Sequence, residues 1–339
     1  MNRRGNRALC WSFIVVVSLA LPSAAQDGIL AAEEAGIDIG TPAGDAPPLG
    51  THDFDHRGGA LPDFLLIPES TNKRVMAFDP ATGNLIDADF IPADDVNLST
   101  PVCAILSSTD DSILVADQIE DVVQEYDLEG NYIGVFAPAG GVNTAILDNI
   151  RGISLRDNGN LLVTVGSGAN ADAVAEFDTD GNYLGNFVAN GAGGLDSPFD
   201  VTLIGNWMVG GITSDAIHMY DATGAYLSDL TAIDSFPEQV AEAGNGNILV
   251  GNFSGSQQGV VEFQTDGTLV GVYAPASLGG YRGAYELPNG NILTTTGDGV
   301  HEIDRSGNLV ETKVSGVSAR FIELISGAVP VELLAIAVE

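Results

Sequence analysis

Arginine side chains are scarce in this chain, and three of them fall at one equivalent position of a repeated pattern, where they could support chemistry. Seven arginines lie beyond residue 25, and Arg151, Arg282 and Arg320 each open a similar strand-forming run: "RGISL", "RGAYEL" and "RFIELI". Glu238 stands at the matching place in a second kind of run, and Asp200 stands beside Phe199 at the entry of another. Because a guanidinium is a planar fork suited to carboxylate, sulfate or phosphate, these five residues predict an anion-binding site.

The same five residues allow a second interpretation. The arginines could pair with Asp200, Glu238 and backbone carbonyls and so join neighbouring parts of the fold. If a divalent ion such as Ca²⁺ is bound, Asp200 and Glu238 are its expected ligands. No catalytic residue is predicted, because the sequence contains no G-x-S-x-G, H-E-x-x-H, P-loop or Rossmann fingerprint.

Cysteine and histidine are not expected to do chemistry. Cys103 has no histidine at the matching places of other runs to activate it, so we expect a small buried residue. His218 and His301 occupy one repeat position in two separate copies, and we expect both to be packed inside the fold.

One sequence pattern occurs six times along the chain. Each copy has an aromatic or aliphatic residue, here called the anchor, followed by a polar turn with glycine, as in "EYDLEGNYI" and "EFDTDGNYL". A Val or Ile precedes every anchor by three residues. Such turns between β-branched and aromatic residues predict β-hairpins. The anchors are Phe78, Tyr126, Phe177, Tyr220, Phe263 and Ile303, spaced by 48, 51, 43, 43 and 40 residues.

Turns such as "NGNLLV" and "NGNILV" add a second hairpin to most copies. Four strands per repeat predict an all-β fold, a six-bladed β-propeller of four-stranded antiparallel blades over residues 61–325. The first copy opens at "DFLLIPES" (63–70), which aligns with the second strand of the others. We therefore expect a C-terminal strand at 318–325 to complete the first blade and close the ring.

The first copy also resembles a known repeat family. "ESTNKRVMAFDPATGNLI" (69–86) is similar to an NHL repeat, and "ILVADQ" (113–118) resembles the strand before its core. The chain from 62 to 325 thus resembles NHL-repeat and six-bladed TolB-like propellers, which implies the same fold. Related gluconolactonase- and paraoxonase-type propellers are metal-dependent hydrolases with calcium or zinc at the channel mouth. In those hydrolases carboxylate and asparagine side chains hold the metal. The strand entries of this chain hold more arginine and less asparagine than that set of metal ligands.

In such a propeller the first strand of each blade lines a central channel, so the predicted anion site lies at the channel mouth. The resulting expectation is a binding or scaffold protein, not an enzyme, that takes a small anion, a glycan or a protein there. The alternative is a metal-dependent hydrolase or lyase of the gluconolactonase and paraoxonase type.

The first 25 residues predict an export signal. Three arginines precede an apolar run at 8–21, and "SAA" offers a cleavage site after Ala25. A retained membrane anchor is the alternative. Beyond it no segment is apolar for long enough to span a membrane. We therefore expect an extracellular or periplasmic protein.

The rest of the chain outside the propeller is an acidic, flexible leader at 26–60 and a tail at 326–339. Removing residues 1–25 takes away three of the twelve basic residues and none of the 46 acidic ones, which leaves a formal charge of −37. Nucleic acids and anionic membranes need a basic surface, so both are excluded as partners. We expect a monomer.

Overall fold

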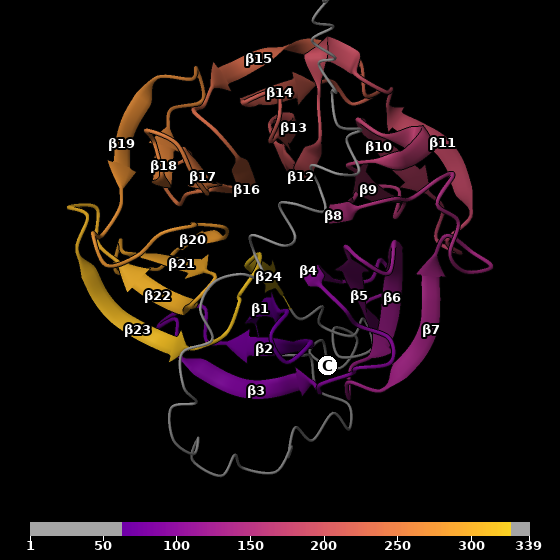
Figure 1. The fold of residues 1–339 in the computed structure, drawn as a ribbon, viewed down its shortest axis with the longest axis horizontal. Helices are drawn as coiled ribbons and strands as arrows, with labels where there is room; N and C mark the ends of the chain where they lie inside the picture. Colours follow the sequence, from indigo (N-terminus) through magenta and orange to yellow (C-terminus); the bar gives the residue numbers. More distant parts are fainter. Residues whose placement is uncertain (1–62, 327–339) are drawn as a thin grey trace, which may run out of the picture. The chain divides into compact units, whose positions relative to one another are not determined.

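Six four-stranded sheets stand around a central axis in a computed structural model that describes residues 63–326 (Figure 1). Neighbouring strands within every sheet are antiparallel. Two short 3₁₀ turns, η1 (Gly168–Asn170) and η2 (Ala192–Gly194), are the only helical elements in this range. The predicted six-bladed β-propeller is confirmed.

The signal at 1–25, the leader at 26–60 and all but the first residue of the tail at 326–339 lie outside the described residues and stay predictions. Within 63–326, no helix has the length and apolar character needed to cross a membrane.

Each blade runs from an innermost strand at the channel to an outermost strand at the rim. Blade 1 comprises β24 (Glu323–Ile325), β1 (Phe64–Glu69), β2 (Arg74–Phe78) and β3 (Leu85–Ile91). Blade 2 comprises β4 (Pro101–Leu106), β5 (Ser112–Asp117), β6 (Val122–Asp127) and β7 (Tyr132–Ala137). Blade 3 comprises β8 (Ile150–Leu155), β9 (Leu161–Val165), β10 (Ala173–Phe177) and β11 (Tyr183–Val188).

The other three blades follow the same order. Blade 4 comprises β12 (Pro198–Ile204), β13 (Asn206–Gly211), β14 (Ala216–Tyr220) and β15 (Tyr226–Ala232). Blade 5 comprises β16 (Pro237–Glu242), β17 (Ile248–Asn252), β18 (Gly259–Phe263) and β19 (Leu269–Tyr273). Blade 6 comprises β20 (Ala284–Glu286), β21 (Ile292–Thr296), β22 (Gly299–Ile303) and β23 (Leu309–Ser315).

The ring closes in blade 1, where β24 pairs with β1 through Leu65 opposite Leu324. This confirms closure by the C-terminal strand, but the strand is shorter than the predicted 318–325. The physical reason lies at Phe321, whose N–H donates to the carbonyl of Val102 in blade 2 instead of to β1. Regular pairing with β1 therefore begins only at Glu323.

The anchors explain why the pattern repeats. Side chains alternate between the two faces of a strand, so residues three apart point in opposite directions. Phe177 packs in a hydrophobic cluster with blade 2, whereas Val174 packs with blade 4. Tyr220 and Ile217 do the same toward blades 3 and 5. Each repeat thus supplies one large side chain to the preceding blade and one aliphatic side chain to the following blade.

The turn glycine after the anchor is needed for two reasons. Gly181 and Gly224 have φ of 74° and 80°, a backbone conformation that glycine adopts freely. A Cβ at either position would also overlap a carbonyl of the preceding blade, that of Phe136 or Phe187. The turn therefore fits against its neighbour only without a side chain.

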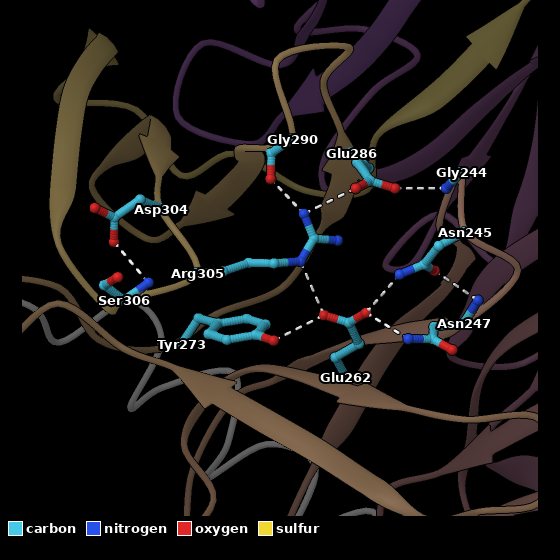
Figure 2. A network of polar contacts seen from close by, with 10 residues as sticks. All are labelled: Gly244, Asn245, Asn247, Glu262, Tyr273, Glu286, Gly290, Asp304, Arg305 and Ser306. Carbon is cyan, nitrogen blue, oxygen red and sulfur yellow. Dashed lines mark hydrogen bonds and ion pairs between the residues drawn. The ribbon is translucent and has the colours of Figure 1, made fainter.

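Blades 5 and 6 are also joined by a buried polar network around Glu262 (Figure 2). Arg305 Nε donates to Glu262 Oε2 at 3.0 Å, and its Nη1 lies 2.8 Å from Glu286 Oε1. Asn247 Nδ2 donates to Glu262 Oε1 at 2.7 Å, and Tyr273 Oη donates to Oε2 at 2.8 Å. Burial favours the protonated acid, but these hydrogen bonds outweigh it and lower the pKa of Glu262 from 4.5 to about 2.

Glu262→Gln should lower the free energy of unfolding at pH 7 by about 1.5–3 kcal/mol, because charge-assisted hydrogen bonds are lost. The folded-state pKa is depressed, so this stabilisation is present above the ordinary pKa and is lost as pH falls toward 2. Urea unfolding at pH 7 and pH 3 measures it, with the exposed Glu129→Gln as control. A difference between wild type and Glu262→Gln that does not shrink at pH 3 would contradict this account.

Candidate functional site

The residues predicted as a site lie where the innermost strands enter the blades, and the strands are irregular there. Pairing shifts between Ile150 and Ile153 in blade 3, and between Pro237 and Val240 in blade 5. Blades 2 and 4 have the same irregularity. A bulge redirects side chains, and here it turns the entry residues toward neighbouring blades.

Arg151 is buried and reaches blade 4. Its Nη1 donates to Ser197 Oγ and to the carbonyl oxygen of Pro198, both at 3.0 Å. The guanidinium carbon lies 4.7 Å from the centre of the Phe199 ring, which is within cation–π range. Arg151 therefore joins blade 3 to blade 4.

Arg282 and Glu238 are brought together by the fold. Arg282 Nε lies 3.9 Å from Glu238 Oε1, and both side chains are buried. Arg282 Nη1 donates to Ser318 Oγ at 2.7 Å, at the entry to the closing strand of blade 1. This pair therefore connects blades 5, 6 and 1.

Arg320 is also buried, and its Nη2 donates to Ser70 Oγ at 3.4 Å in the turn after β1. The contacts of Arg151 and Arg282 fit the inter-blade interpretation, whereas this contact of Arg320 lies within blade 1. They do not test whether an anion binds, so the anion site of Arg151, Asp200, Glu238, Arg282 and Arg320 stays a prediction.

Asp200 lies one residue deeper in the channel than the arginines, and its two oxygens accept main-chain hydrogen bonds. Oδ1 accepts from Val201 N and Oδ2 from Val240 N, both at 2.8 Å, so the carboxyl bridges blades 4 and 5. Gly152 provides the space, because a Cβ there would lie 2.6 Å from Asp200 Oδ1.

The metal ligands considered in the sequence do not fit a metal ion well. Asp200 already accepts two N–H groups, and Glu238 lies beside the guanidinium of Arg282. Among residues 63–326, no three His, Cys, Asp or Glu side chains are grouped so as to hold a metal ion. We derive no metal-dependent step from these residues.

The channel contains a cavity of about 420 Å³, here called the channel pocket, at the opposite end of the innermost strands from the arginines. All six innermost strands contribute to it, and its lining combines aliphatic side chains such as Leu106, Ile153 and Val240 with Asp200, Gln239 and Glu323. No Arg, Lys or His is among the described residues that line it. Its volume is within the range of small-molecule sites.

Gln239 and Glu323 hold this pocket together across the ring. Gln239 Nε2 donates to Glu323 Oε1 at 2.9 Å and to the carbonyl oxygen of Ile322 at 2.8 Å. Gln239 Oε1 accepts from Ala284 N at 3.1 Å. Cys103 Sγ lies 3.7 Å from Glu323 Oε1 and is fully buried, as expected for that residue.

Sequence reasoning missed Gln239 and Glu323. One signal was present, because Glu323 is the only acid in the apolar closing strand "RFIELI". A carboxylate in a strand that lines a channel needs a polar partner, and Gln239 supplies it.

The two acids have strongly raised pKa values. Burial raises the pKa of Asp200 from 3.8 to about 7, against the hydrogen bonds from Val240 and Val201. Burial and the charge of Asp200 raise the pKa of Glu323 from 4.5 to about 8, against the hydrogen bonds from Gln239 and Cys103. Both of these acids in the channel pocket therefore retain protons near neutral pH.

Stability should fall as pH rises from about 4 to about 8. Both folded-state pKa values lie above the ordinary ones, so the unfolded chain releases protons that the folded protein retains. Glu323→Gln should make the fall in melting temperature between pH 5 and 9 shallower. Glu242→Gln removes an exposed carboxylate of the same pocket and is the control. An unchanged slope in Glu323→Gln would contradict the assignment.

Arg282→Ala should lower the free energy of unfolding by about 3–5 kcal/mol, because it leaves the buried carboxylate of Glu238 without its cation. Lys73→Ala removes the same charge from a more exposed pair, 3.2 Å from Asp95, and should cost at most about 1 kcal/mol. Urea unfolding of both variants measures the difference. Equal effects would show that Arg282 does not hold the blades together.

Comparisons with known proteins support the fold. No family model matches the sequence, and no curated protein matches it. Nidogen, in a nidogen/laminin complex, is similar in structure with a TM-score of 0.59 and 13% identity, over 78% of this chain and 100% of that one. A gluconolactonase from Xanthomonas campestris gives 0.55 and 14%, over 68% and 84%. A streptogramin B lyase gives 0.51 and 13%, over 76% and 84%.

These similar structures are six-bladed β-propellers, and at such identities they establish the fold alone. The fold is shared by a binding protein and by enzymes, so it does not choose between the two functions predicted from the sequence. The choice has to come from the residues of this chain.

Proposed function

We propose that this protein is a binding protein that takes a small organic cation, such as an amine, into the channel pocket without catalysing a reaction there. The observation that carries the proposal is that two acids, Asp200 and Glu323, line one cavity with no basic side chain among its described lining residues. An ammonium group bound there would displace a proton and pair with the carboxylate. The aliphatic lining would cover the rest of the ligand.

The arginines have a structural role in this proposal. Arg151 and Arg282 donate to groups of the next blade, so their positive charges are already directed at protein acceptors. A small anion, a glycan or a protein bound at the arginine end is the competing form of the same binding function. Export to an extracellular or periplasmic location, as a monomer, is part of the proposal and follows from the N-terminal 25 residues and the high negative charge.

The test is the melting temperature of the protein with benzylamine, benzyl alcohol or benzoate, three probes of similar size and different charge. A ligand at ten times its Kd stabilises the folded state by about 1.4 kcal/mol, which corresponds to roughly 2–4 °C. We expect benzylamine alone to raise the midpoint, more at pH 8.5 than at pH 6, because binding competes with protons at Glu323. The effect should be lost in Glu323→Gln and kept in Glu242→Gln.

Each other outcome points to a different function. A shift with benzoate that disappears in Arg320→Ala would support the anion site and overturn the channel proposal. A shift with millimolar Ca²⁺ that a chelator reverses would support the metal-dependent hydrolase or lyase. A benzylamine shift that is equal in wild type and Glu323→Gln would place binding outside the channel pocket.

A further inference from the structure

Blade 4 contains three polar side chains in contact that the channel pocket does not use. Ser214 lies in the turn between β13 and β14, His218 in β14 and Asp229 in β15. Ser214 Oγ lies 2.8 Å from His218 Nε2, and His218 Nδ1 lies 2.7 Å from Asp229 Oδ1. A hydroxyl, an imidazole and a carboxylate in this order form the arrangement that activates a serine nucleophile.

His218 is in the state that a general base needs. It is buried, and burial lowers the pKa of the imidazole, although Asp229 opposes this effect. The ring is therefore neutral at pH 7. Asp229 Oδ1 lies 2.7 Å from Nδ1, although the contact falls outside hydrogen-bond geometry. When Nδ1 carries the proton, the lone pair of Nε2 faces the hydroxyl of Ser214, 2.8 Å away.

Blade 6 provides an internal comparison. His301 is at the same repeat position as His218, and its two ring nitrogens contact Thr296 Oγ1 and Thr312 Oγ1, both at 3.1 Å. Both partners there are neutral hydroxyls, which is a sufficient structural role for a buried histidine. In blade 4 the two partners of the histidine are different residues, Ser214 in place of Thr296 and Asp229 in place of Thr312.

The differences in blade 4 follow from strand register. Asp229 faces His218 across the strand pair where Thr312 faces His301. Gly211 occupies the position of Thr296, and a Cβ at Gly211 would overlap Ser214 Oγ. The hydroxyl beside His218 therefore comes from the turn and not from the strand, so it lies nearer the surface of the protein.

Ser214 can be reached by a small molecule. It is half-buried between the exposed residues Thr213 and Asp215, and the side chain of Asp229 is 46% exposed. Within residues 63–326, the amides of Ser214 and Asp215 donate to no protein acceptor, whereas Ile212 and Thr213 donate to the preceding loop. Those two amides are the donors that an oxyanion at Ser214 could use.

We propose that Ser214 is the nucleophile of a serine-hydrolase site for small neutral or cationic carboxylic esters, separate from the channel pocket. His218 is the general base, and Asp229 is a positioning residue that holds its tautomer. The acidic side chains around the turn, Asp215 and Asp229, disfavour anionic esters. The proposal does not depend on ligand binding in the channel.

The chemistry balances without a co-reactant other than water. Ser214 Oγ bonds to the ester carbonyl carbon while its proton moves to His218 Nε2. The bond from the carbonyl carbon to the alcohol oxygen then breaks, and that oxygen takes the proton from Nε2. Water repeats the sequence on the acyl-serine, which releases the carboxylic acid and restores Ser214.

The test is labelling of the full chain with an alkyl fluorophosphonate, in which Ser214 Oγ bonds to phosphorus and fluoride leaves. We expect one adduct per chain at Ser214, located by peptide mass spectrometry, and none in Ser214→Ala. Asp229→Asn should slow labelling by roughly 10²-fold or more, because the tautomer of His218 is no longer held. The rate should fall in acid as His218 is protonated.

Ser235→Ala is the matched control, because Ser235 is half-buried and contacts only another hydroxyl, Ser254 Oγ at 3.1 Å. It should label like wild type, and melting curves confirm that each variant is folded. No adduct at Ser214, or equal rates in wild type and Asp229→Asn, would overturn the proposal even if Ser214→Ala does not fold. Release of p-nitrophenol from p-nitrophenyl acetate, lost in Asp229→Asn, would extend it from labelling to turnover.

Discussion

Packing between adjacent blades is the constraint on which the rest of this structure depends. A four-stranded sheet has two faces to cover, and each blade covers them only with its two neighbours. The repeat provides for this with an anchor on one face and Val or Ile three residues earlier on the other, as Phe177 and Val174 illustrate. The turn glycines then allow the blades to approach closely. A ring is the arrangement in which no blade has an uncovered face.

Polar residues follow the same constraint. Arg151, Arg282 and Arg305 each make contacts beyond their own blade, and their partners are hydroxyls, carbonyls and buried acids. Basic side chains are rare in this chain, and those described lie mainly at the contacts between adjacent blades. The channel pocket is left with acids and aliphatic side chains, and the proposed cation site rests on this composition.

Much of the fold could be predicted from the sequence, because strand alternation and turn glycines are local signals. Six blades and closure by the C-terminal strand follow from the spacing of anchors such as Phe78 and Ile303. The direction of Arg151 and Glu238 could not be predicted in the same way, because a bulge at the strand entry changes which way a side chain points. The sequence left open an anion site at the channel mouth and pairing between neighbouring blades, and the contacts of Arg151 and Glu238 are of the second kind.

Asp200 was among the residues predicted from the sequence, but the partners that complete the two proposed sites could not be predicted, for a physical reason. Glu323 and Gln239 are 84 residues apart, and only the closed ring brings them within 2.9 Å. Asp229 faces His218 through a strand pair with two register shifts, so spacing alone does not align them. In each case the partners belong to different strands, and their contact depends on register and not on sequence distance.

Glu323 belongs both to the channel pocket and to the three-residue strand that closes the ring. A ligand that pairs with Glu323 would therefore also hold the closing strand against the other innermost strands that line the pocket. With a ligand in the channel, a larger force on the C-terminal end would be needed to detach the closing strand than in the empty ring. For a protein attached to a surface by that end, the ligand would then set how much tension the fold withstands.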